Sequence, residues 1–416
     1  MPSTYPLPSG PLAAARPKIR LLVVGHTYLT MFSQRKYVAM KRADPTLQLR
    51  LVTPPEIIHP FMRYRHERHP ELQPEETMPI PVWFGGSHMS YVLHPWKLAA
   101  VLREFSPTHV HIEEDPHSAV GIETVTLTRI FCRRALISFF IWDNLARVPR
   151  IPLNWVKRVL THYSFSRSAF VVSGNREGEQ LLRSHKGYVG PAAVLPQVGL
   201  DFEDYASPPR AEIRARVLAT DEPWIGFVGR LVPEKGLGDL FEALASLTSL
   251  RWSLLIIGSG SLKAEIERTW QPLFGARLVC LDAVPHADVA DYLKCLDIFV
   301  LPSRTMDFWK EQFGLTLAQA MMAGVACIGS NSGAIPEVIG ASGIVVPERD
   351  PAALRAALHR VLTSPELRKE LQQAARKSSI ERFTNSSVAA SYLALFRSAD
   401  KKSCTASPEC PLSLIE

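Results

Sequence analysis

The sequence has no long hydrophobic run. Hydrophobic residues make up 46% of its 416 residues, but no apolar stretch approaches the roughly 20 residues that a helix needs to span a bilayer. The first 17 residues are proline-rich and lack the apolar core of a signal peptide. We therefore expect residues 1–17 to form a disordered tail, followed by a soluble, cytoplasmic protein.

Cysteine is scarce, and its spacing indicates no special chemistry. No two cysteines form a CxxC pair or another spacing typical of metal ligands. The six positions are Cys132, Cys280, Cys295, Cys327, Cys404 and Cys410. This pattern predicts a reducing compartment and no structural metal.

The sequence also lacks any module typical of nucleic-acid binding, although its formal net charge is +7. Such an excess of basic residues can favour an acidic substrate, an anionic lipid surface or a nucleic acid. We find no basic recognition helix, RNP-like strand or zinc finger. We therefore expect no nucleic-acid partner.

Short apolar strands alternate with longer helical patterns along the whole chain. This alternation predicts parallel sheets built from βαβ units, and the chain length suits two domains of roughly 180 to 200 residues. The expected strands are 19–24, 47–52, 109–112, 135–141, 169–173 and 193–195 in the first half, and 224–228, 252–257, 277–281, 298–301, 325–330 and 343–346 in the second. The predicted fold class is α/β, with two doubly wound, Rossmann-like domains facing each other across a cleft.

The domain boundary is expected after the turn at residues 196–201, because the proline-containing stretch that follows has no core pattern. The two domains are then residues 18–201 and 202–377. Residues 378–398 are expected to form a helix that crosses back onto the N-terminal domain, through an apolar stripe of Phe383, Val388, Tyr392 and Leu395. Residues 399–416 are expected to be a disordered tail.

Two cations follow the first expected strand of the second domain. Arg230 and Lys235 come directly after residues 224–228, in a turn that begins at Gly229. Fixed cations at the carboxyl end of a strand suit a diphosphate. The alternative is a surface loop with two ordinary cations.

The segment 304–340 carries the strongest functional signal. Glu311 stands just before an apolar helix at 315–323, whose free N–H groups suit an anion such as phosphate. The carboxylate can accept hydrogen bonds from sugar hydroxyls, and Gln319 lies two turns further on the same helix face. Alternatively, Glu311 simply favours the helix dipole, and Gln319 fills a helix position.

Further candidates lie after other strands. Gly258 and Gly260 allow close backbone approach, although a lone GxG is a weak signal. In the first half, His26 and Thr27 follow one strand, and a run of acids that includes Glu113 and Glu114 follows another. Successive acids are costly to bury, which favours a position in the cleft; the alternative is a solvated acidic turn.

Two segments mix basic and aromatic residues. They are 59–70, with Phe61 and Tyr64, and 147–167, with Trp155, Lys157 and Arg158. This composition suits the headgroup level of an anionic membrane or a phosphorylated acceptor. The alternative is an ordinary solvated face.

Taken together, these residues resemble a known family, the retaining nucleotide-sugar glycosyltransferases of family 4 (glycosyl transferases group 1), whose fold is GT-B. The resemblance is carried by IGFVGRLVPEKGLGDLFEAL, LLIIGSGSLKAEIE, YLKCLDIFVLPSR and WKEQFGLTLAQAMMAGVACIGSNSGAIPEVIG, and more weakly by VHIEEDPHS, VLPQVGLD and ERFTNSSVAASYLALF. It implies an acceptor-binding N-terminal domain and a donor-binding C-terminal domain.

The resemblance also implies roles for individual residues. Arg230 and Lys235 hold the donor diphosphate, and Glu311, the first glutamate of an E-x7-E motif, contacts the donor sugar. The backbone from Phe313 through Gly314 to Leu315 helps to hold sugar and phosphate, so no metal or other cofactor is expected.

Three departures from the family pattern stand out. The second glutamate of E-x7-E is Gln319, and Glu113 replaces a histidine found near the donor sugar. The loop after the first strand has a single glycine, at Gly25.

The expected function is the transfer of a hexose from a nucleoside diphosphate sugar to a glycan or lipid-linked acceptor with retention, in surface polysaccharide or glycolipid biosynthesis. His26, Thr27, Glu113 and Glu114 are candidates for the acceptor and sugar side. Two alternatives stay open, a non-catalytic nucleotide- or glycan-binding partner and a sugar-nucleotide epimerase.

Overall fold

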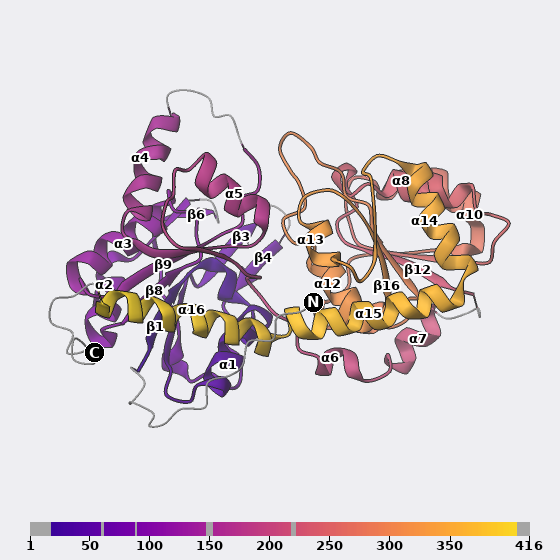
Figure 1. The fold of residues 1–416 in the computed structure, drawn as a ribbon. Helices are drawn as coiled ribbons and strands as arrows, with labels where there is room; N and C mark the ends of the chain where they lie inside the picture. The colour runs from indigo at the N-terminus through magenta and orange to yellow at the C-terminus, as the bar shows by residue number, and fades with distance from the viewer. Residues whose placement is uncertain (1–17, 60–61, 88–89, 147–152, 218–221, 406–416) are drawn as a thin grey trace, which may run out of the picture.

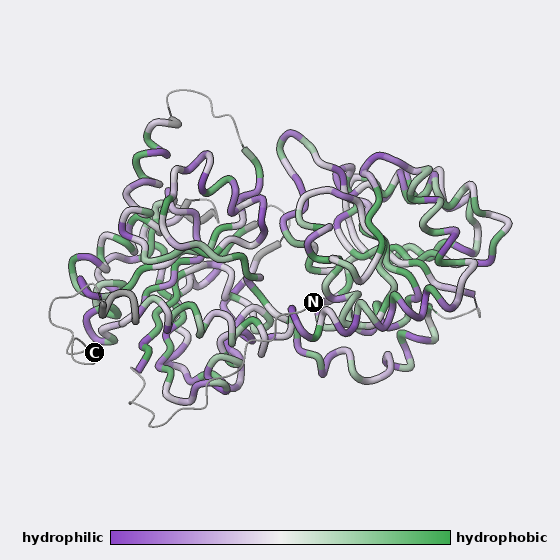
Figure 2. The backbone as a smooth tube through the Cα atoms, in the orientation of Figure 1, coloured by the Kyte–Doolittle hydropathy of each residue, from purple (hydrophilic) through white to green (hydrophobic). Residues whose placement is uncertain are grey.

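The computed structural model describes residues 18–59, 62–87, 90–146, 153–217 and 222–405. The expected tail at 1–17, Phe61 and the start of the second basic segment lie outside the described residues. The described chain forms two α/β domains, joined by the linker after β11 and by two long helices at the C-terminal end (Figure 1). The most hydrophobic segments are the central strands of each domain (Figure 2).

The N-terminal domain is built on seven parallel strands in the order β11-β10-β9-β8-β1-β2-β5. The strands are β1 (Arg20–Val24), β2 (Gln48–Thr53), β5 (Thr77–Pro79), β8 (His109–Ile112), β9 (Leu136–Ile141), β10 (Ser168–Ser173) and β11 (Ala192–Val194). The surrounding helices are α1 (Met31–Ala43), α2 (Pro95–Phe105), α3 (Ala119–Phe131), α4 (Leu153–Phe165) and α5 (Arg176–Ser184), with a short 3-10 turn, η1 (His26–Leu29), after β1. The central strands are apolar runs because helices cover both faces of a parallel sheet.

A second, four-stranded sheet in this domain was not predicted. Its order is β4-β3-β6-β7, with β3 (Glu56–His59), β4 (Met62–Arg65), β6 (Val82–Ser87) and β7 (Ser90–Leu93). The strand β3 ends at the first residue of the basic segment 59–70, β4 lies within this segment, and β6 contains two glycines. Strands of four to six residues give little periodic signal in a sequence.

The C-terminal domain has six parallel strands in the order β14-β13-β12-β15-β16-β17. They are β12 (Trp224–Val228), β13 (Ser253–Ile257), β14 (Leu278–Leu281), β15 (Ile298–Leu301), β16 (Ala326–Ser330) and β17 (Ile344–Val346). The helices are α6 (Glu203–Ala206), α7 (Ala211–Val217), α8 (Leu237–Ala245), α9 (Lys263–Glu265), α10 (Gln271–Phe274), α11 (His286–Leu293), α12 (Leu315–Ala323), α13 (Ile335–Ile339) and α14 (Pro351–Thr363).

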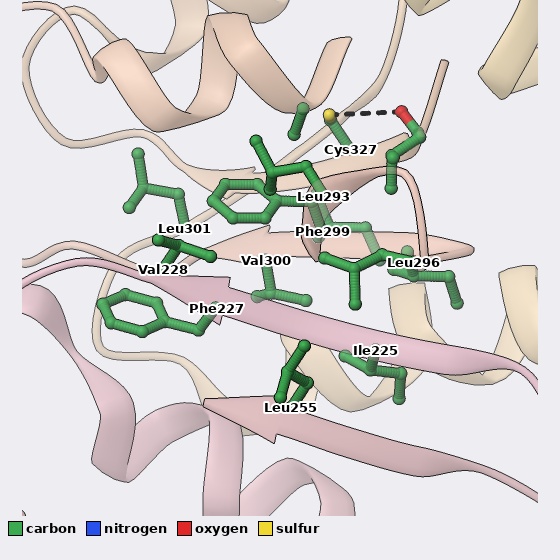
Figure 3. Packing of buried hydrophobic residues seen from close by; sticks show 14 of the residues in the cluster. Ile225, Phe227, Val228, Leu255, Leu293, Leu296, Phe299, Val300, Leu301 and Cys327 are labelled. Carbon is green, nitrogen blue, oxygen red and sulfur yellow. Dashed lines mark hydrogen bonds between the residues drawn. The ribbon is translucent and has the colours of Figure 1, made fainter. Parts of the chain in front are cut away.

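The core of the C-terminal domain lies on both faces of β12. Ile225 and Phe227 are fully buried, and Leu255 and Val300 on the neighbouring strands pack with them (Figure 3). Burying a large aliphatic or aromatic side chain contributes about 1.5–3 kcal/mol. This packing fixes where β12 and β15 end, and therefore where the loops after them begin. All twelve predicted strands are confirmed, with ends shifted by at most one residue.

The connection back to the N-terminal domain differs from the expected single helix at 378–398. The helix α15 (Pro365–Phe383) ends at Phe383, Thr384 is extended, and α16 (Asn385–Thr405) then packs on α1. The apolar stripe is divided accordingly, since Phe383 is buried in the C-terminal core and Tyr392 in the N-terminal one. The helix α16 also runs to Thr405, past residue 399 where we expected a tail. Within the described residues, no helix is both long and apolar enough to span a membrane.

Candidate functional site

The carboxyl ends of β12 and β15 meet at the point where the strand order of the C-terminal sheet reverses. From β12 the chain runs toward one edge, through β13 and β14, and from β15 toward the other, through β16 and β17. Open α/β sheets bind ligands at such a switch point. Arg230 and Lys235 follow β12, and Glu311 follows β15.

Lys235 and Glu311 form an ion pair at this switch point. The Nζ of Lys235 lies 2.7 Å from Oε2 of Glu311, which also accepts a hydrogen bond from Ser303 Oγ at 3.0 Å. The ring of Trp309 covers the ammonium, with its centroid 4.7 Å from Nζ. The side chain of Lys235 is only 13% exposed. The pair therefore gives the site a fixed cation beside a fixed hydrogen-bond acceptor.

Arg230 is placed differently from Lys235. Its side chain is 48% exposed, and its nearest acid, Glu234, is 3.4 Å away. An exposed ion pair of this kind is weak. The guanidinium is therefore free to turn toward a ligand beside Lys235.

The glycines of the site allow backbones to pack closely. A Cβ at Gly258 would come within 1.8 Å of the Gly229 carbonyl oxygen, and one at Gly260 within 2.3 Å of the Leu231 carbonyl oxygen. The loops after β12 and β13 therefore touch each other directly. This contact alone accounts for Gly258 and Gly260, and a role of Gly229, Gly258 and Gly260 in ligand binding stays a prediction.

The helix α12 begins at Gly314, which has a left-handed backbone (φ 79°). The Phe313 side chain before it is buried, with its ring 5.5 Å from that of Phe383 and 6.2 Å from that of Trp142. The backbone of residues 313–315, rather than the Phe313 side chain, is thus suited to a ligand, because the first N–H groups of the helix lack acceptors within it.

The N-terminal sheet has a switch point of the same kind, between β1 and β8. His26 follows β1 and Glu114 follows β8, and the imidazole Nδ1 lies 2.7 Å from the Glu114 carboxylate. The same carboxylate accepts hydrogen bonds from the His26 backbone N–H at 2.8 Å and from the Tyr91 hydroxyl at 2.6 Å. Burial opposes the charged imidazole, but the nearby carboxylates, with Glu114 foremost and Asp115 and Glu113 behind it, together outweigh burial and raise the pKa of His26.

Glu113 is not in the cleft as we expected, because its side chain is fully buried beneath the site. Its carboxylate accepts hydrogen bonds from Lys36 and Tyr37, both at 2.9 Å, and from Gln197 at 2.7 Å. Burial disfavours the charge, yet the Lys36 ammonium holds the pKa of Glu113 far below its usual range. Gln197 also donates to Thr27 Oγ1 at 3.1 Å, so Glu113 supports the turn after β1 through Gln197.

Comparison with known proteins identifies the C-terminal half. The family model of glycosyl transferases group 1 matches residues 209–378, which contain Arg230, Lys235 and Glu311. Residues 209–378 belong to the glycosyl transferases group 1.

Two curated mycobacterial relatives illustrate the similarity. A GDP-mannose-dependent alpha-(1-6)-phosphatidylinositol monomannoside mannosyltransferase of Mycolicibacterium smegmatis is 30% identical over 189 residues, covering 42% of this chain and 49% of the relative. The enzyme of the same name from Mycobacterium tuberculosis H37Rv is 27% identical over 327 residues, covering 72% and 74%. The matches to the first three curated relatives span less than half of each relative.

Solved structures show the fold over nearly the whole chain. A glycosyltransferase from Rickettsia africae ESF-5 aligns with a TM-score of 0.68 at 16% identity, over 92% of this chain and 99% of that one. Sucrose-phosphate synthase from Thermosynechococcus elongatus aligns with a TM-score of 0.63 at 19% identity, over 92% and 100%. The architecture is GT-B, as predicted.

Gln319, at the second E-x7-E position of this group 1 domain, is 2% exposed. Burial raises the pKa of the Tyr205 hydroxyl in α6 and the neighbouring Gln319 amide partly offsets this rise, so Tyr205 is a partner that the sequence did not indicate. Glu311 and Gln319 therefore have different partners, and a shared ligand stays a prediction.

Two residues near the group 1 motif were missed in the sequence. Asn144 and Asn175 of the N-terminal domain donate hydrogen bonds to the backbone carbonyls of Glu311 and Gln312. Both asparagines come within three residues of the end of a predicted strand. Polar residues at that position were the available signal.

Proposed function

We propose that this protein is a glycosyltransferase that moves a hexose from a nucleoside diphosphate sugar to a hydroxyl group of a glycan or lipid-linked acceptor, with retention of configuration. The observation that carries the proposal is the ion pair of Lys235 and Glu311 at the switch point of a group 1 domain, with Arg230 beside it.

The proposed chemistry needs a site that stabilises a departing diphosphate. As the bond between the sugar carbon and the phosphate oxygen breaks, negative charge grows on the diphosphate. Lys235 is already fixed by Glu311 and Trp309, and Arg230 is free to approach. Preorganised cations of this kind lower the barrier because little reorganisation is needed during the reaction. Glu311 is held where it can accept hydrogen bonds from sugar hydroxyls.

The names of the relatives guide the choice of donor and acceptor. GDP-mannose and phosphatidylinositol mannoside appear in the names of the mycobacterial relatives, and a fold neighbour from Anabaena was solved with UDP-glucose. We propose GDP-mannose and UDP-glucose as the first donors to test. An acceptor in surface polysaccharide or glycolipid biosynthesis suits the basic N-terminal domain.

The N-terminal domain also supports peripheral contact with an anionic membrane, from the cytoplasmic side. Twelve of the fifteen large hydrophobic side chains that are exposed among the described residues lie in this domain. Trp155, Arg158 and Val159 are exposed on one face of α4, and Lys157 is exposed on the opposite side of the helix. Apolar and basic residues on one helix face suit the interface of an anionic bilayer.

The test is a transfer assay with purified protein, each donor and an extract of lipid-linked and soluble glycans. We expect release of nucleoside diphosphate together with an acceptor that gains one hexose by mass spectrometry, and loss of both in Lys235→Ala. Nucleotide release without a glycosylated product would contradict transfer to these acceptors. A changed donor sugar without any acceptor would indicate an epimerase, and binding without turnover a non-catalytic partner.

A further inference from the structure

The loop that carries Glu311 is held from the opposite domain. The backbone carbonyl of Glu311 accepts a hydrogen bond from Asn144 Nδ2 at 2.9 Å, and that of Gln312 accepts one from Asn175 Nδ2 at 2.8 Å. Within its own domain, the Glu311 carbonyl has one further donor, the Ala334 N–H at 3.0 Å. Two consecutive peptide units of the loop that carries Glu311 thus accept hydrogen bonds from side chains of the N-terminal domain.

Both asparagines are rigid donors. Asn144 and Asn175 are 4% and 1% exposed. The Asn175 side chain is fixed at its other end, because its Oδ1 accepts a hydrogen bond from Gly178 N–H at 2.7 Å and caps α5. The contact is therefore specific rather than incidental.

Other contacts across the domains lie around these two bonds. Lys310 Nζ is 2.8 Å from the Glu177 carboxylate, and the Arg176 N–H donates to Glu337 Oε2 at 2.9 Å. The ring of Trp142, next to β9, lies 6.2 Å from Phe313. The carboxyl ends of β9 and β10 thus meet the loop between β15 and α12, and this loop is part of the domain interface.

We propose that Asn144 and Asn175 are positioning residues, which fix the Glu311 loop across the domain interface so that the sugar site is set correctly only when the domains are closed. This inference rests on the proposed function for its kinetic consequence. The nucleotide should bind mainly through the C-terminal domain, whereas the position of the sugar should depend on both domains. Loss of the two bonds should therefore lower kcat while nucleotide affinity changes little.

The sharpest variants are Asn144→Asp, Asn175→Asp and the two combined. Aspartate has the shape of asparagine and caps a helix equally well, but an ionised carboxylate has no hydrogen to donate. Asn175→Asp thus retains the α5 cap and replaces the bond to Gln312 with a carboxylate oxygen that faces the Gln312 carbonyl oxygen. Asn331→Asp is the matched control, since Asn331 is exposed and its Oδ1 only accepts a hydrogen bond, from the Glu348 N–H at 2.8 Å.

We expect kcat of the double variant to fall about 10- to 100-fold, the scale of a misplacement of about 1 Å at a reacting centre, with unchanged Kd for the nucleoside diphosphate. Activity relative to wild type should recover at acidic pH, because the introduced carboxyl groups regain a donor hydrogen when they are protonated. A fall without acid recovery, or an equal fall in Asn331→Asp, would overturn the proposal.

A measurement that does not depend on turnover distinguishes failure of this inference from failure of the proposed function. Small-angle X-ray scattering should show a larger radius of gyration for the double variant than for wild type and for Asn331→Asp, because the domains open. An unchanged radius would overturn the role of the asparagines even if the protein is an active transferase. A larger radius in a protein without turnover would retain the interdomain role and reject the proposed function.

Discussion

Lys235 Nζ and Glu311 Oε2 lie 2.7 Å apart although 76 residues separate them in the chain. The pair exists because β12 and β15 are neighbours at the switch point of the sheet. His26 and Glu114 form a pair of the same length, 2.7 Å, at the switch point of the other sheet. Each domain thus has a base paired with an acid at the position where its fold favours a ligand.

Substitution of Lys235 should lower stability more than substitution of Glu311. Lys235→Ala leaves a buried carboxylate with Ser303 as its remaining partner, so it should lower the free energy of unfolding as well as turnover, the latter about 100- to 1000-fold. Glu311→Gln retains the shape and should lower turnover with a smaller loss of stability. Denaturant unfolding and steady-state kinetics of both single variants and the double variant measure the coupling. Additive effects on stability would mean that the pair does not form.

Gln319→Glu tests whether the second position of the motif contacts the ligand. A carboxylate in place of this buried amide should lower the melting temperature, because burying a charge without a cation is costly. If the side chain reaches the ribose hydroxyls, nucleoside diphosphate should restore more stability to the variant than to wild type. Thermal unfolding with and without nucleotide measures both. Equal shifts by nucleotide in both proteins would place Gln319 outside the site.

The His26–Glu114 pair should make stability depend on pH. The folded pKa of His26 is raised above its ordinary value of 6.5, so protonation favours the folded state. The stabilisation is then complete below about pH 6.5 and is lost as pH rises through the raised folded value. The melting temperature of His26→Asn should therefore fall furthest below wild type in acid, with a smaller gap at alkaline pH. A gap that is constant with pH would contradict the ion pair.

Membrane contact through α4 should depend on Trp155 and on its basic neighbours. Trp155, 73% exposed, should contribute apolar area at the interface, and each basic residue about 1 kcal/mol near an anionic surface. Trp155→Ala and Arg158→Ala should weaken sedimentation with anionic vesicles, with little effect on neutral vesicles. Leu273→Ala, an exposed apolar residue of the C-terminal domain, is the control. Equal binding of all four proteins to anionic vesicles would rule out this face.

Much of the fold could be predicted because its strands are buried on both faces. Strands such as β12 and β15 are continuous apolar runs, and such runs fix both the strand and the place where its loop begins. The positions of Arg230, Lys235 and Glu311 after these strands could be predicted for the same reason, whereas their roles in binding a donor stay predictions. The four-stranded sheet had no such pattern. The break at Thr384 had a local signal that we missed, because Thr384 is a favourable N-cap residue and its Oγ1 accepts a hydrogen bond from the Ser387 N–H at 3.2 Å.

The different environments of the neighbouring acids Glu113 and Glu114 could not be predicted from the sequence. Glu113 and Glu114 are adjacent in sequence. The Glu113 side chain is fully buried in an ion pair with Lys36 of α1, whereas the Glu114 carboxylate pairs with His26. The interdomain bonds of Asn144 and Asn175 likewise depend on how two domains meet. Such partners are set by the tertiary structure, and the local sequence does not indicate which residues will pair.

The most direct test of the central claim is a thermal-shift measurement with GDP, UDP, ADP and dTDP, and with their common sugar conjugates, on wild type and Arg230→Ala. The account predicts that one nucleoside diphosphate raises the melting temperature of wild type and has much less effect on the variant. Because Arg230 is exposed, the variant without ligand should melt close to wild type. The account would be contradicted if no nucleotide stabilised wild type, or if the same nucleotide stabilised both proteins equally.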